Sequence, residues 1–494
     1  MCPDPARRGR FLLYSGPCRC VSFNLNWNSK LKIRNYVKNQ QRLLAAGLIS
    51  LALLGPLALA GCKGVSTRGE KQARAELKSI AQVYRPGGRK RTLPALDTNS
   101  PLADFLTYAM LNQPRVEAAF YDWAASIERI TQARSLPDPQ FTFQMDIQNI
   151  ITSIMPGLMG SIPWPDKLRV GAQIASAESR ARYFDFQSAV LTSAFEVKRA
   201  YYQLCFLAEK IRVNQDTLDL LNDLEKLARA QNEVGKVTLQ DVLRAQIEQD
   251  RLKTGIANLE DSRHSLLAQF KAALGLGSDD PTPPMPGRFE STPPALSADK
   301  LLETALARNP RLKAMEADVR AAEASIILAQ KARRPDFSLG LMADAEMTPA
   351  RYRPLGAVSL PIWRDKIAAE IAEAQGRKSA ATARLSAEQI ALAVDFAEKS
   401  FTFREASRNL ALLQDQLIPK ARLSLEVARS GYLSGQIDFL NLINAEQSLL
   451  GFQLDEVAAR TQRELALVEL SLLIASLPPA NAPVMPSNHK PALN

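Results

Sequence analysis

Two stretches, EVGKVTLQDVLRAQ at residues 233–246 and LSGQIDFLNLINAEQ at residues 433–447, repeat one pattern 200 positions apart. Each contains a glycine, Gly235 or Gly435, that is followed by an apolar segment with helical spacing. Glycine adopts a positive φ at little cost because it has no Cβ. The two stretches therefore predict the turns of two long antiparallel helical hairpins of the same design.

Three further landmarks occur once in each half of the chain, in the same order. They are LNQPRVEAAF around Pro114 with ARNPRLKAME around Pro310, LPDPQFTFQ around Pro139 with RRPDFSLGL around Pro335, and SIPWPDKL around Trp164 with LPIWRDKI around Trp363. Their offsets are 196, 196 and 199 residues, close to the spacing of the two glycines. Self-similarity of this kind indicates two copies of one structural unit.

Each copy is expected to open with a helix of about 35 residues, starting near Ser100 or Ser297 and stopped by a proline, Pro137 or Pro335. Short runs then alternate between apolar and polar residues, a period typical of strands. The apolar members are Phe141, Phe143, Met145 and Ile147 in the first copy and Phe337, Leu339 and Leu341 in the second. Second strands are expected to end at Ile162 and Leu360. Four strands per chain are too few to close a barrel.

Very long helices follow the strands. From Asp166 to Asn232 the chain has 67 residues without a proline, and as one helix this segment would be about 100 Å long. Pro419 is expected to divide the corresponding helix of the second copy into two pieces. After each turn glycine, apolar residues recur in steps of three and four, as in a coiled-coil seam. They are Leu252, Ile256, Leu259, Leu266, Phe270 and Leu274, and then Leu450, Leu454, Val457, Leu465, Val468 and Leu472.

The composition limits the class of protein. Of 494 residues, 46% are apolar and 23% charged, which excludes a disordered chain and a polytopic helical membrane protein. Two His and five scattered Cys leave no material for a His/Cys zinc cluster. The sequence has no Gly-rich phosphate loop and no nucleophile elbow. We therefore expect no catalytic residue, no metal ligand and no cofactor other than a covalent lipid.

The basic charge is concentrated at the N-terminus. Residues 1–61 hold nine Lys or Arg and one acid, and so contribute +8 of the net charge of +11. An apolar run at residues 43–60 and then Gly61-Cys62 complete the pattern of a secretory signal peptide. The string LAGC at residues 59–62 resembles a bacterial lipobox, which predicts a lipid such as palmitate on Cys62. The alternative is one transmembrane anchor, for which 18 residues interrupted by Gly55-Pro56 are marginal.

After processing, the net charge of the remaining chain is only +3, so the sequence does not support nucleic acid as a partner. Cys205 lies in an apolar helical stretch and is expected to be a small buried side chain.

The sequence divides into six predicted segments. They are a signal peptide at 1–61, a lipidated extended segment at 62–99, a first repeat at 100–277, a Pro-rich linker at 278–296, a second repeat at 297–476 and a disordered tail at 477–494. Residues 1–30 are expected to precede the true translation start.

A tandem repeat of helix, strand, strand and helical hairpin behind a lipobox resembles the TolC family of outer-membrane efflux channels. The resemblance rests on the paired N-x-P and NP openings, the Pro-Asp strand entries, the exits at Trp164 and Trp363, and the turns at Gly235 and Gly435. It implies a mainly α fold whose long hairpins form a periplasmic tunnel, with four strands per chain in a trimeric twelve-stranded β-barrel. It also implies outer-membrane lipid, a periplasmic adaptor protein and an inner-membrane pump, expected to be of the RND type, as partners, and passive passage of cargo.

The resemblance also places candidate gate residues at the tips of the hairpins. Family members carry carboxylates six and nine residues after the second turn glycine, and here those positions are Asn441 and Asn444. The family's tyrosine is retained as Tyr432, whereas a basic residue is replaced by Ile437. In the first copy the equivalent positions are Asp241 and Arg244, which could pair with a neighbour. The asparagines either line a constriction that is less cation-selective than a carboxylate ring or only cap and solvate the hairpin end.

Two alternatives remain open at the level of sequence. A periplasmic coiled-coil lipoprotein acting as an adaptor or scaffold would also be long and helical, but would be expected to have one hairpin between β-rich modules. Five methionines fall in the strand and loop segments, where thioethers either bind Cu(I) or Ag(I) or serve as apolar filler. These are Met145, Met155, Met159, Met342 and Met347.

Overall fold

A computed structural model describes residues 66–147, 151–287, 289, 298–344 and 351–474. These residues belong to one compact unit. The predicted signal peptide, Cys62 and the predicted tail lie outside the described residues, as do part of the linker and Met347.

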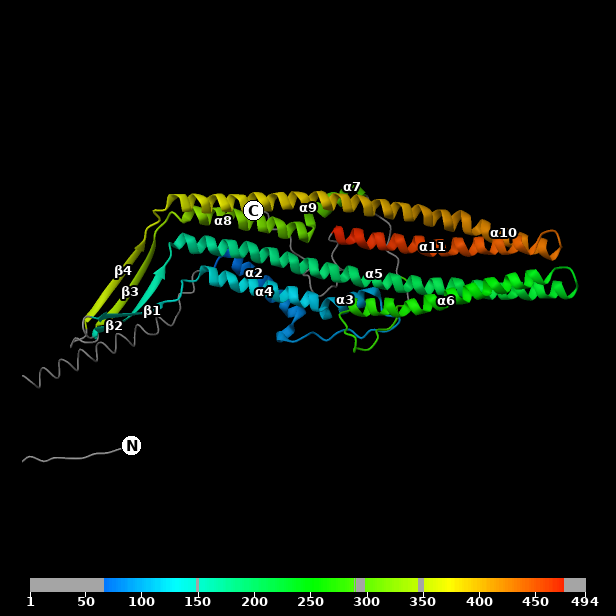
Figure 1. Cartoon of the computed structure of the whole chain (residues 1–494), viewed down its shortest axis with the longest axis horizontal. Helices are drawn as coiled ribbons and strands as arrows, with labels where there is room; N and C mark the ends of the chain where they lie inside the picture. The colour runs from blue at the N-terminus through cyan, green and yellow to red at the C-terminus, as the bar shows by residue number, and fades with distance from the viewer. Residues whose placement is uncertain (1–65, 148–150, 288, 290–297, 345–350, 475–494) are drawn as a thin grey trace, which may run out of the picture. The chain divides into compact units, whose positions relative to one another are not determined.

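Both copies of the repeat have the same order of elements (Figure 1). The first copy comprises α3 (Leu102–Asn112), α4 (Pro114–Arg134), β1 (Gln140–Ile147), β2 (Ile151–Ile162), α5 (Pro165–Glu233) and α6 (Leu239–Ala273). The second comprises α7 (Ala298–Arg308), α8 (Pro310–Lys331), β3 (Asp336–Asp344), β4 (Arg351–Ser359), α9 (Arg364–Leu412), the π-helix η2 (Leu413–Leu417), α10 (Ile418–Leu433) and α11 (Phe439–Leu473). The mainly helical fold with four strands is therefore confirmed.

The prediction of an extended segment at 62–99 is wrong for the part that forms α2 (Arg68–Tyr84). This stretch is rich in Ala, Glu, Lys and Gln, which favour helix, and the Thr67 hydroxyl caps it by accepting from the Glu70 amide at 3.2 Å. The Glu70 carboxylate, itself buried, accepts from Arg134 Nε of α4 at 2.8 Å. An apolar face and a buried ion pair therefore hold α2 against the first repeat, and the short 3₁₀ turn η1 (Pro86–Gly88) follows it.

The prediction of a single opening helix of about 35 residues is also wrong, because each copy has two helices there, and the second of them begins at a proline. Pro114 and Pro310 each begin the second helix, because proline lacks an amide hydrogen and restricts the residue before it. Next to each break, an asparagine side chain donates hydrogen bonds to carbonyls at the end of a helix far along the chain. Asn112 Nδ2 donates to the carbonyls of Leu274 and Gly275, both at 3.1 Å, where the chain leaves α6. Asn309 Nδ2 repeats the contact with the carbonyl of Leu473 at 3.2 Å.

The long helix α5 is continuous over 69 residues, as predicted, and is about 100 Å long. It packs against α4 and α6 of its own repeat and against α8 and α11 of the second. The largest buried cluster forms where α5 meets α3 and α4, and it includes stacked Trp123 and Phe186 rings 5.9 Å apart. Pro419 lies in the first turn of α10, directly after η2, and the backbone stays helical from α9 through η2 into α10. The predicted break of the second long helix into two pieces is therefore wrong: a π-helical turn takes its place, and it accommodates the proline without ending the helix.

The four strands form one antiparallel sheet in the order β1-β2-β3-β4. Residues opposite one another share a face, and the pairings Phe141–Leu158 and Leu158–Leu341 place these three on one side. This side is apolar and exposed, as Phe141 at 71% and Leu339 at 60% show. Its members are Phe141, Phe143, Met145, Leu158, Ile162, Phe337, Leu339, Leu341 and Val358. The other side is mostly polar or small, with Thr142, Gln144, Gly157, Ser161, Ser338, Arg353 and Ser359.

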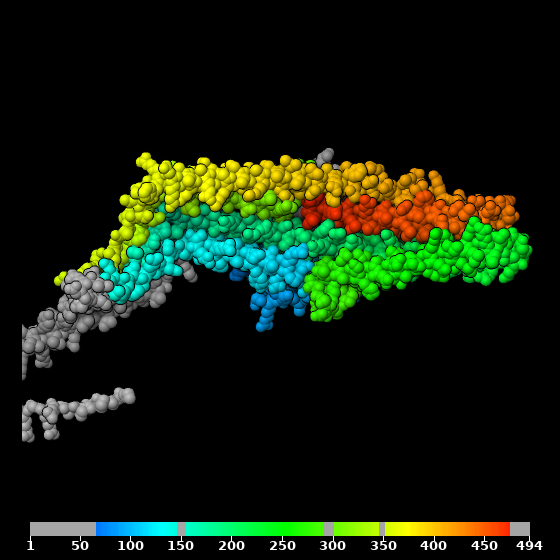
Figure 2. All heavy atoms as spheres, viewed as in Figure 1, coloured from blue at the N-terminus to red at the C-terminus, as the bar shows by residue number. Residues whose placement is uncertain are grey.

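Within the described unit, the sheet lies at one end of the helices and the two hairpin turns lie at the other (Figure 1). In Figure 2 the green surface of α6 and the orange to red surface of α10 and α11 run together toward the turns. The helix α5 thus joins the sheet to the tips, which are the two places where the sequence predicts contact with the surroundings.

We expect Asn112→Ala to lower the stability of the first repeat by about 1–2 kcal/mol, because two carbonyls after α6 lose a partly buried donor. The thermal melting temperature of the purified protein measures this effect. Asn441→Ala, at an exposed position, is the matched control and should leave the melting temperature unchanged. Equal melting temperatures for Asn112→Ala and the control would contradict the role of Asn112.

Candidate functional site

The two turns at the tips have the same backbone geometry. Gly235 and Gly435 have φ values of 72° and 76°. The amide after each glycine donates back across the end of the helix, from Lys236 to the Gln231 carbonyl and from Gln436 to the Gly431 carbonyl, both at 2.9 Å. This is the Schellman arrangement, which needs a left-handed residue at the glycine position. The predicted roles of Gly235 and Gly435 are therefore confirmed.

One buried cluster, called here the tip cluster, joins the ends of the two hairpins. It contains side chains from α5, α6, α10 and α11, so each hairpin covers an apolar face of the other. Its buried members are Leu221, Leu224, Ala228, Val242, Ala245, Ala428, Tyr432, Phe439, Leu442 and Ile443. The tips of the two repeats are therefore one packed body within the chain.

Tyr432 lies inside the tip cluster and is only 5% exposed. Its ring centroid is 5.3 Å from that of Phe439, at an interplanar angle of 58°. Its hydroxyl has no hydrogen-bond partner among the described residues. Burial, and then the negative charge of Asp241, raise the pKa of the Tyr432 hydroxyl to about 12. Tyr432 is thus a buried anchor with an unsatisfied polar group.

Asp241 and Arg244 lie in the first turns of α6, near the same cluster. Burial raises the pKa of the Asp241 carboxyl, while Arg244 lowers it and Asp438 of the other hairpin raises it. The structure therefore brings Tyr432, Asp241 and Asp438 from both repeats to one place. Two carboxylates and one guanidinium therefore lie close enough to influence one another at the edge of the tip cluster.

Asn441 and Asn444 are both exposed on α11. The neighbouring Leu442 and Ile443 point into the tip cluster, so the two asparagines occupy the outer face of the helix. The N-cap of α11 is Asp438, and the Asn441 amide donates to its carbonyl at 3.0 Å. Neither asparagine is therefore the cap of the helix. Their side-chain amides face away from the tip cluster, toward water or a neighbouring surface.

Glu446 is a functional candidate that the sequence patterns above do not identify. It is 2% exposed, and its Oε1 has no hydrogen-bond partner among the described residues. Burial, and then the charge of Glu248 on the other hairpin, raise the pKa of the Glu446 carboxyl to about 7. The signal was present in the sequence, since Glu446 follows Leu442 and Ile443 at helical spacing on the apolar stripe.

The methionines divide between the two faces of the sheet. Met155 and Met159 of β2 flank Gly157, which pairs with Met342 of β3, so these three share the polar side. Met145 lies on the apolar side and is exposed there, as expected for a filler or lipid-facing residue.

In the described part of the chain, no group of three or more His, Cys, Asp or Glu residues could hold a metal ion. Cys205 packs against the largest buried cluster, as its apolar stretch predicts, but it is half-buried rather than fully buried, and the partial burial raises the pKa of its thiol to about 12.

No helix among the described residues combines the length and the apolar character needed to cross a lipid bilayer.

A family model described as "Outer membrane efflux protein" matches residues 107–276 and 301–476, one range in each copy of the repeat. The chain belongs to the outer membrane efflux protein family. The predicted resemblance to efflux channels is therefore confirmed, and this efflux protein is a transport component of the outer membrane.

Two relatives of this efflux protein are named for different compounds. The cobalt-zinc-cadmium resistance protein CzcC of Cupriavidus metallidurans is 21% identical over 327 residues, covering 65% of this chain and 77% of the relative. The pyoverdine export outer membrane protein OpmQ of Pseudomonas putida is 23% identical over 380 residues, covering 69% and 80%.

Solved structures share the fold of this efflux protein. The outer membrane protein VceC of Vibrio cholerae superimposes with a TM-score of 0.65 at 16% identity, over 76% of this chain and 95% of that one. The outer membrane channel CmeC of Campylobacter jejuni superimposes with a TM-score of 0.66 at 13% identity, over 83% and 92%. The sheet and the two hairpins are therefore the fold of known outer-membrane channels.

We expect Glu446→Gln to stabilise this efflux protein at pH 8 by up to about 3 kcal/mol and to have little effect at pH 4.5. The folded chain binds the Glu446 proton more tightly than the unfolded chain does. Stability in the wild type therefore falls as the pH rises from the ordinary carboxyl pKa of 4.5 to the folded value of about 7. The variant should lose this dependence.

Melting temperatures measured between pH 4.5 and 8 test this expectation. Glu426→Gln, an exposed carboxyl on α10, is the matched control and should follow the wild type at every pH. If the melting temperature of Glu446→Gln keeps the wild-type pH dependence, burial does not raise the pKa of the Glu446 carboxyl, and the expectation is wrong.

Proposed function

We propose that this efflux protein forms a homotrimeric channel that gives cargo a passive path across the outer membrane. The observation that carries the proposal is the two-faced sheet at one end of two long hairpins. An exposed apolar face beside a mostly polar face suits a sheet that separates lipid from water. The family membership sets the cellular location, and the proposal concerns the assembly and how it works.

The edges of the sheet require other chains. Strands β1 and β4 are the first and last in the order, so each has one side unpaired within the sheet. Unpaired backbone groups are not tolerated in lipid, which leaves closure into a barrel as the solution. Four strands from each of three chains give twelve, and outer-membrane barrels use even numbers of this size.

The helices also leave apolar surface for neighbouring chains. On α6, Leu239, Leu243 and Ile247 are exposed at successive helical turns. On α9 and α10, Ile390, Val394, Leu423 and Val427 are exposed in the same way. Contact between hairpins of adjacent chains would cover these stripes and would close a tunnel below the barrel. The channel then needs no catalytic group, because its task is passage.

The tip is the proposed gate and the proposed meeting place with a periplasmic adaptor and an RND-type inner-membrane pump. Asn441 and Asn444 are exposed there, and we assign them to the lining of a constriction that is less cation-selective than a carboxylate ring. The Tyr432 ring packs behind it in the tip cluster, and Asp241 lies at the edge of that cluster. The adaptor-like alternative predicts one hairpin between β-rich modules, whereas the described chain has two hairpins on one sheet.

A lipid on Cys62 is the proposed second attachment to the membrane. Cys62 itself lies outside the described residues, and the support is the signal-peptide pattern with its LAGC string. Intact mass of the protein extracted from membranes tests this assignment, since a lipidated chain starts at residue 62 and carries acyl groups. A mass equal to the unmodified chain would remove the lipid anchor.

The cargo class is proposed only as broadly as the relatives allow. One relative is named for resistance to cobalt, zinc and cadmium and another for pyoverdine export, so metal ions, drugs and other small molecules all remain candidates. We infer that the inner-membrane pump selects the cargo, because the channel offers a passage without a chemical step.

We expect the wild type, extracted from outer membranes, to be a trimer that conducts ions in planar lipid bilayers. Leu339→Arg should abolish assembly, because a charge on the lipid-facing side costs about 2–4 kcal/mol per chain. Ser338→Arg, the next residue on the opposite side of β3, is the matched control and should assemble and conduct. A soluble or inner-membrane monomer would overturn the channel and favour the adaptor reading.

We expect Asn444→Asp to increase the preference of the channel for cations, because three carboxylates would then surround the constriction. Reversal potentials in a salt gradient across a planar bilayer measure the preference. Asp455→Asn, farther from the turn on the same helix, serves as the control and should not change it. An unchanged cation preference in Asn444→Asp would remove Asn444 from the constriction.

A further inference from the structure

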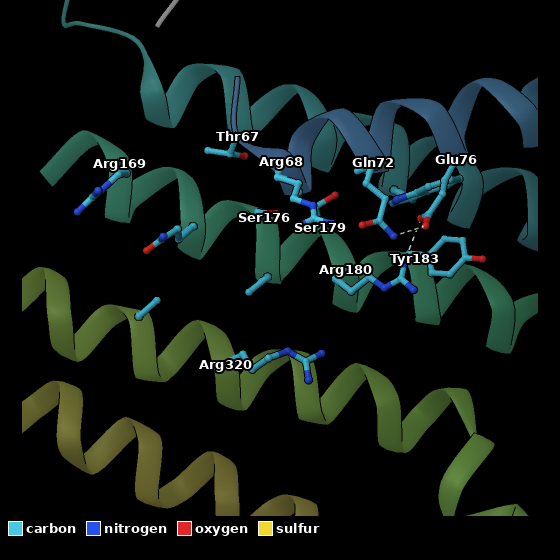
Figure 3. A pocket seen from close by; sticks show the side chains of 16 residues that line it. Thr67, Arg68, Gln72, Glu76, Arg169, Ser176, Ser179, Arg180, Tyr183 and Arg320 are labelled. Carbon is cyan, nitrogen blue, oxygen red and sulfur yellow. Dashed lines mark hydrogen bonds and ion pairs between the residues drawn. The ribbon is translucent and has the colours of Figure 1, made fainter. Parts of the chain in front are cut away.

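A cavity lies where α2, α5 and α8 meet (Figure 3). Its residues on α5, Arg169 to Tyr183, belong to the part of that helix that follows the sheet. Its volume is about 650 Å³, within the range of sites for small ligands. Arg68 comes from the start of α2, Arg180 from α5 and Arg320 from α8, so three elements each supply a guanidinium. Neither the proposed channel nor its gate uses this cavity.

The cavity carries an excess of positive charge. Four arginines and a single carboxylate, Glu76, line it in the described chain. Glu76 is already engaged, since Arg180 Nη1 donates to its Oε2 at 2.7 Å and Gln72 Nε2 to its Oε1 at 3.0 Å. Arg169 is paired with Asp166 at 3.0 Å. Among the described residues, Arg68 and Arg320 make no ion pair, so two guanidiniums are left for an anion.

The start of α2 adds backbone donors to the same place. Thr67 caps this helix of 17 residues, and its hydroxyl is occupied by the Glu70 amide. The amides of Arg68 and Gly69, in the first turn, have no partner within the helix. A Cβ on Gly69 would lie 2.6 Å from Ser176 Oγ, so glycine allows the backbone to approach α5 at the wall of the cavity. The positive end of the helix dipole therefore reinforces the arginines.

The position of the cavity suits a membrane surface, an argument that rests on the proposed function. On α5, Arg169 and Arg180 lie about 6 and 22 Å along the axis from Pro165, which follows β2 by three residues. Cys62 is five residues before Thr67, and five residues of chain reach at most about 18 Å. Both the barrel and the lipid anchor would hold the cavity close to the inner leaflet of the outer membrane.

We propose that this cavity binds the phosphate of an anionic phospholipid headgroup from the inner leaflet. Guanidinium groups match phosphate oxygens with two parallel donors, and several such groups give selectivity for phosphate over smaller anions. Arg68 and Arg320 bind the phosphate from opposite walls, and Arg180 supports it while paired with Glu76. A soluble phosphate shares this chemistry, and the test separates the two sources.

Calorimetric titration of the purified trimer in non-ionic detergent tests the proposal, with short-chain phosphatidylglycerol, short-chain phosphatidylcholine and inorganic phosphate as probes. We expect saturable binding of phosphatidylglycerol and affinities at least about tenfold weaker for the other two probes. The double variant Arg68→Gln/Arg320→Gln should bind phosphatidylglycerol about 100-fold more weakly. Arg384→Gln, an exposed arginine on α9, is the matched control and should bind as the wild type does.

Each other outcome overturns a defined part of the proposal. Equal affinity for inorganic phosphate and for phosphatidylglycerol would overturn the lipid as the source. Wild-type affinity in the double variant would overturn the site, and Arg68→Lys/Arg320→Lys, which keeps the charge, should restore part of the binding lost in the glutamine variant. Conductance is recorded on the same samples: a conducting trimer without lipid binding defeats this inference alone, whereas a wild type that does not conduct defeats the proposed function.

Discussion

The packing of α5 is the constraint on which the rest of the structure depends. An isolated helix of 69 residues would expose apolar side chains along its whole length, and here helices from both repeats cover it. The same helix begins three residues after the sheet and ends at the Gly235 turn. Because it cannot bend sharply without a proline or an inserted residue, it sets the distance between the membrane end and the tip.

Much of this organisation could be predicted because it depends on local chemistry. Prolines end helices, glycines allow a positive φ, and alternation marks strands, so the turns at Gly235 and Gly435 and the faces of the sheet followed from the sequence. The helix α2 could also have been found, since its composition and its Thr67 cap are local signals. The prediction of an extended segment at 62–99 took neither of these signals into account.

The rest depends on contacts between residues far apart in the chain. That Asn112 would bind the end of α6, about 160 residues later, follows from no local pattern. The meeting of Tyr432 with Asp241, and of Glu446 with Glu248, likewise requires the two hairpins to be packed together. Sequence periodicity indicates which face is buried, but it does not show which partner buries it. The arginines around the cavity come from three different helices, so their proximity could not be predicted from the sequence for the same reason.

The π-helix η2 has a consequence for symmetry. From Trp164 to Gly235 the first copy spans 71 positions, and from Trp363 to Gly435 the second spans 72. A π-helical turn accommodates one additional residue within a helix, and η2 takes it up between Leu413 and Leu417. The residues beyond it, including Tyr432, regain the helical phase of their counterparts in the first copy. Six hairpins in a ring of three chains would thus be nearly equivalent at the tips and different halfway along, so the tunnel would have true threefold and only local sixfold symmetry.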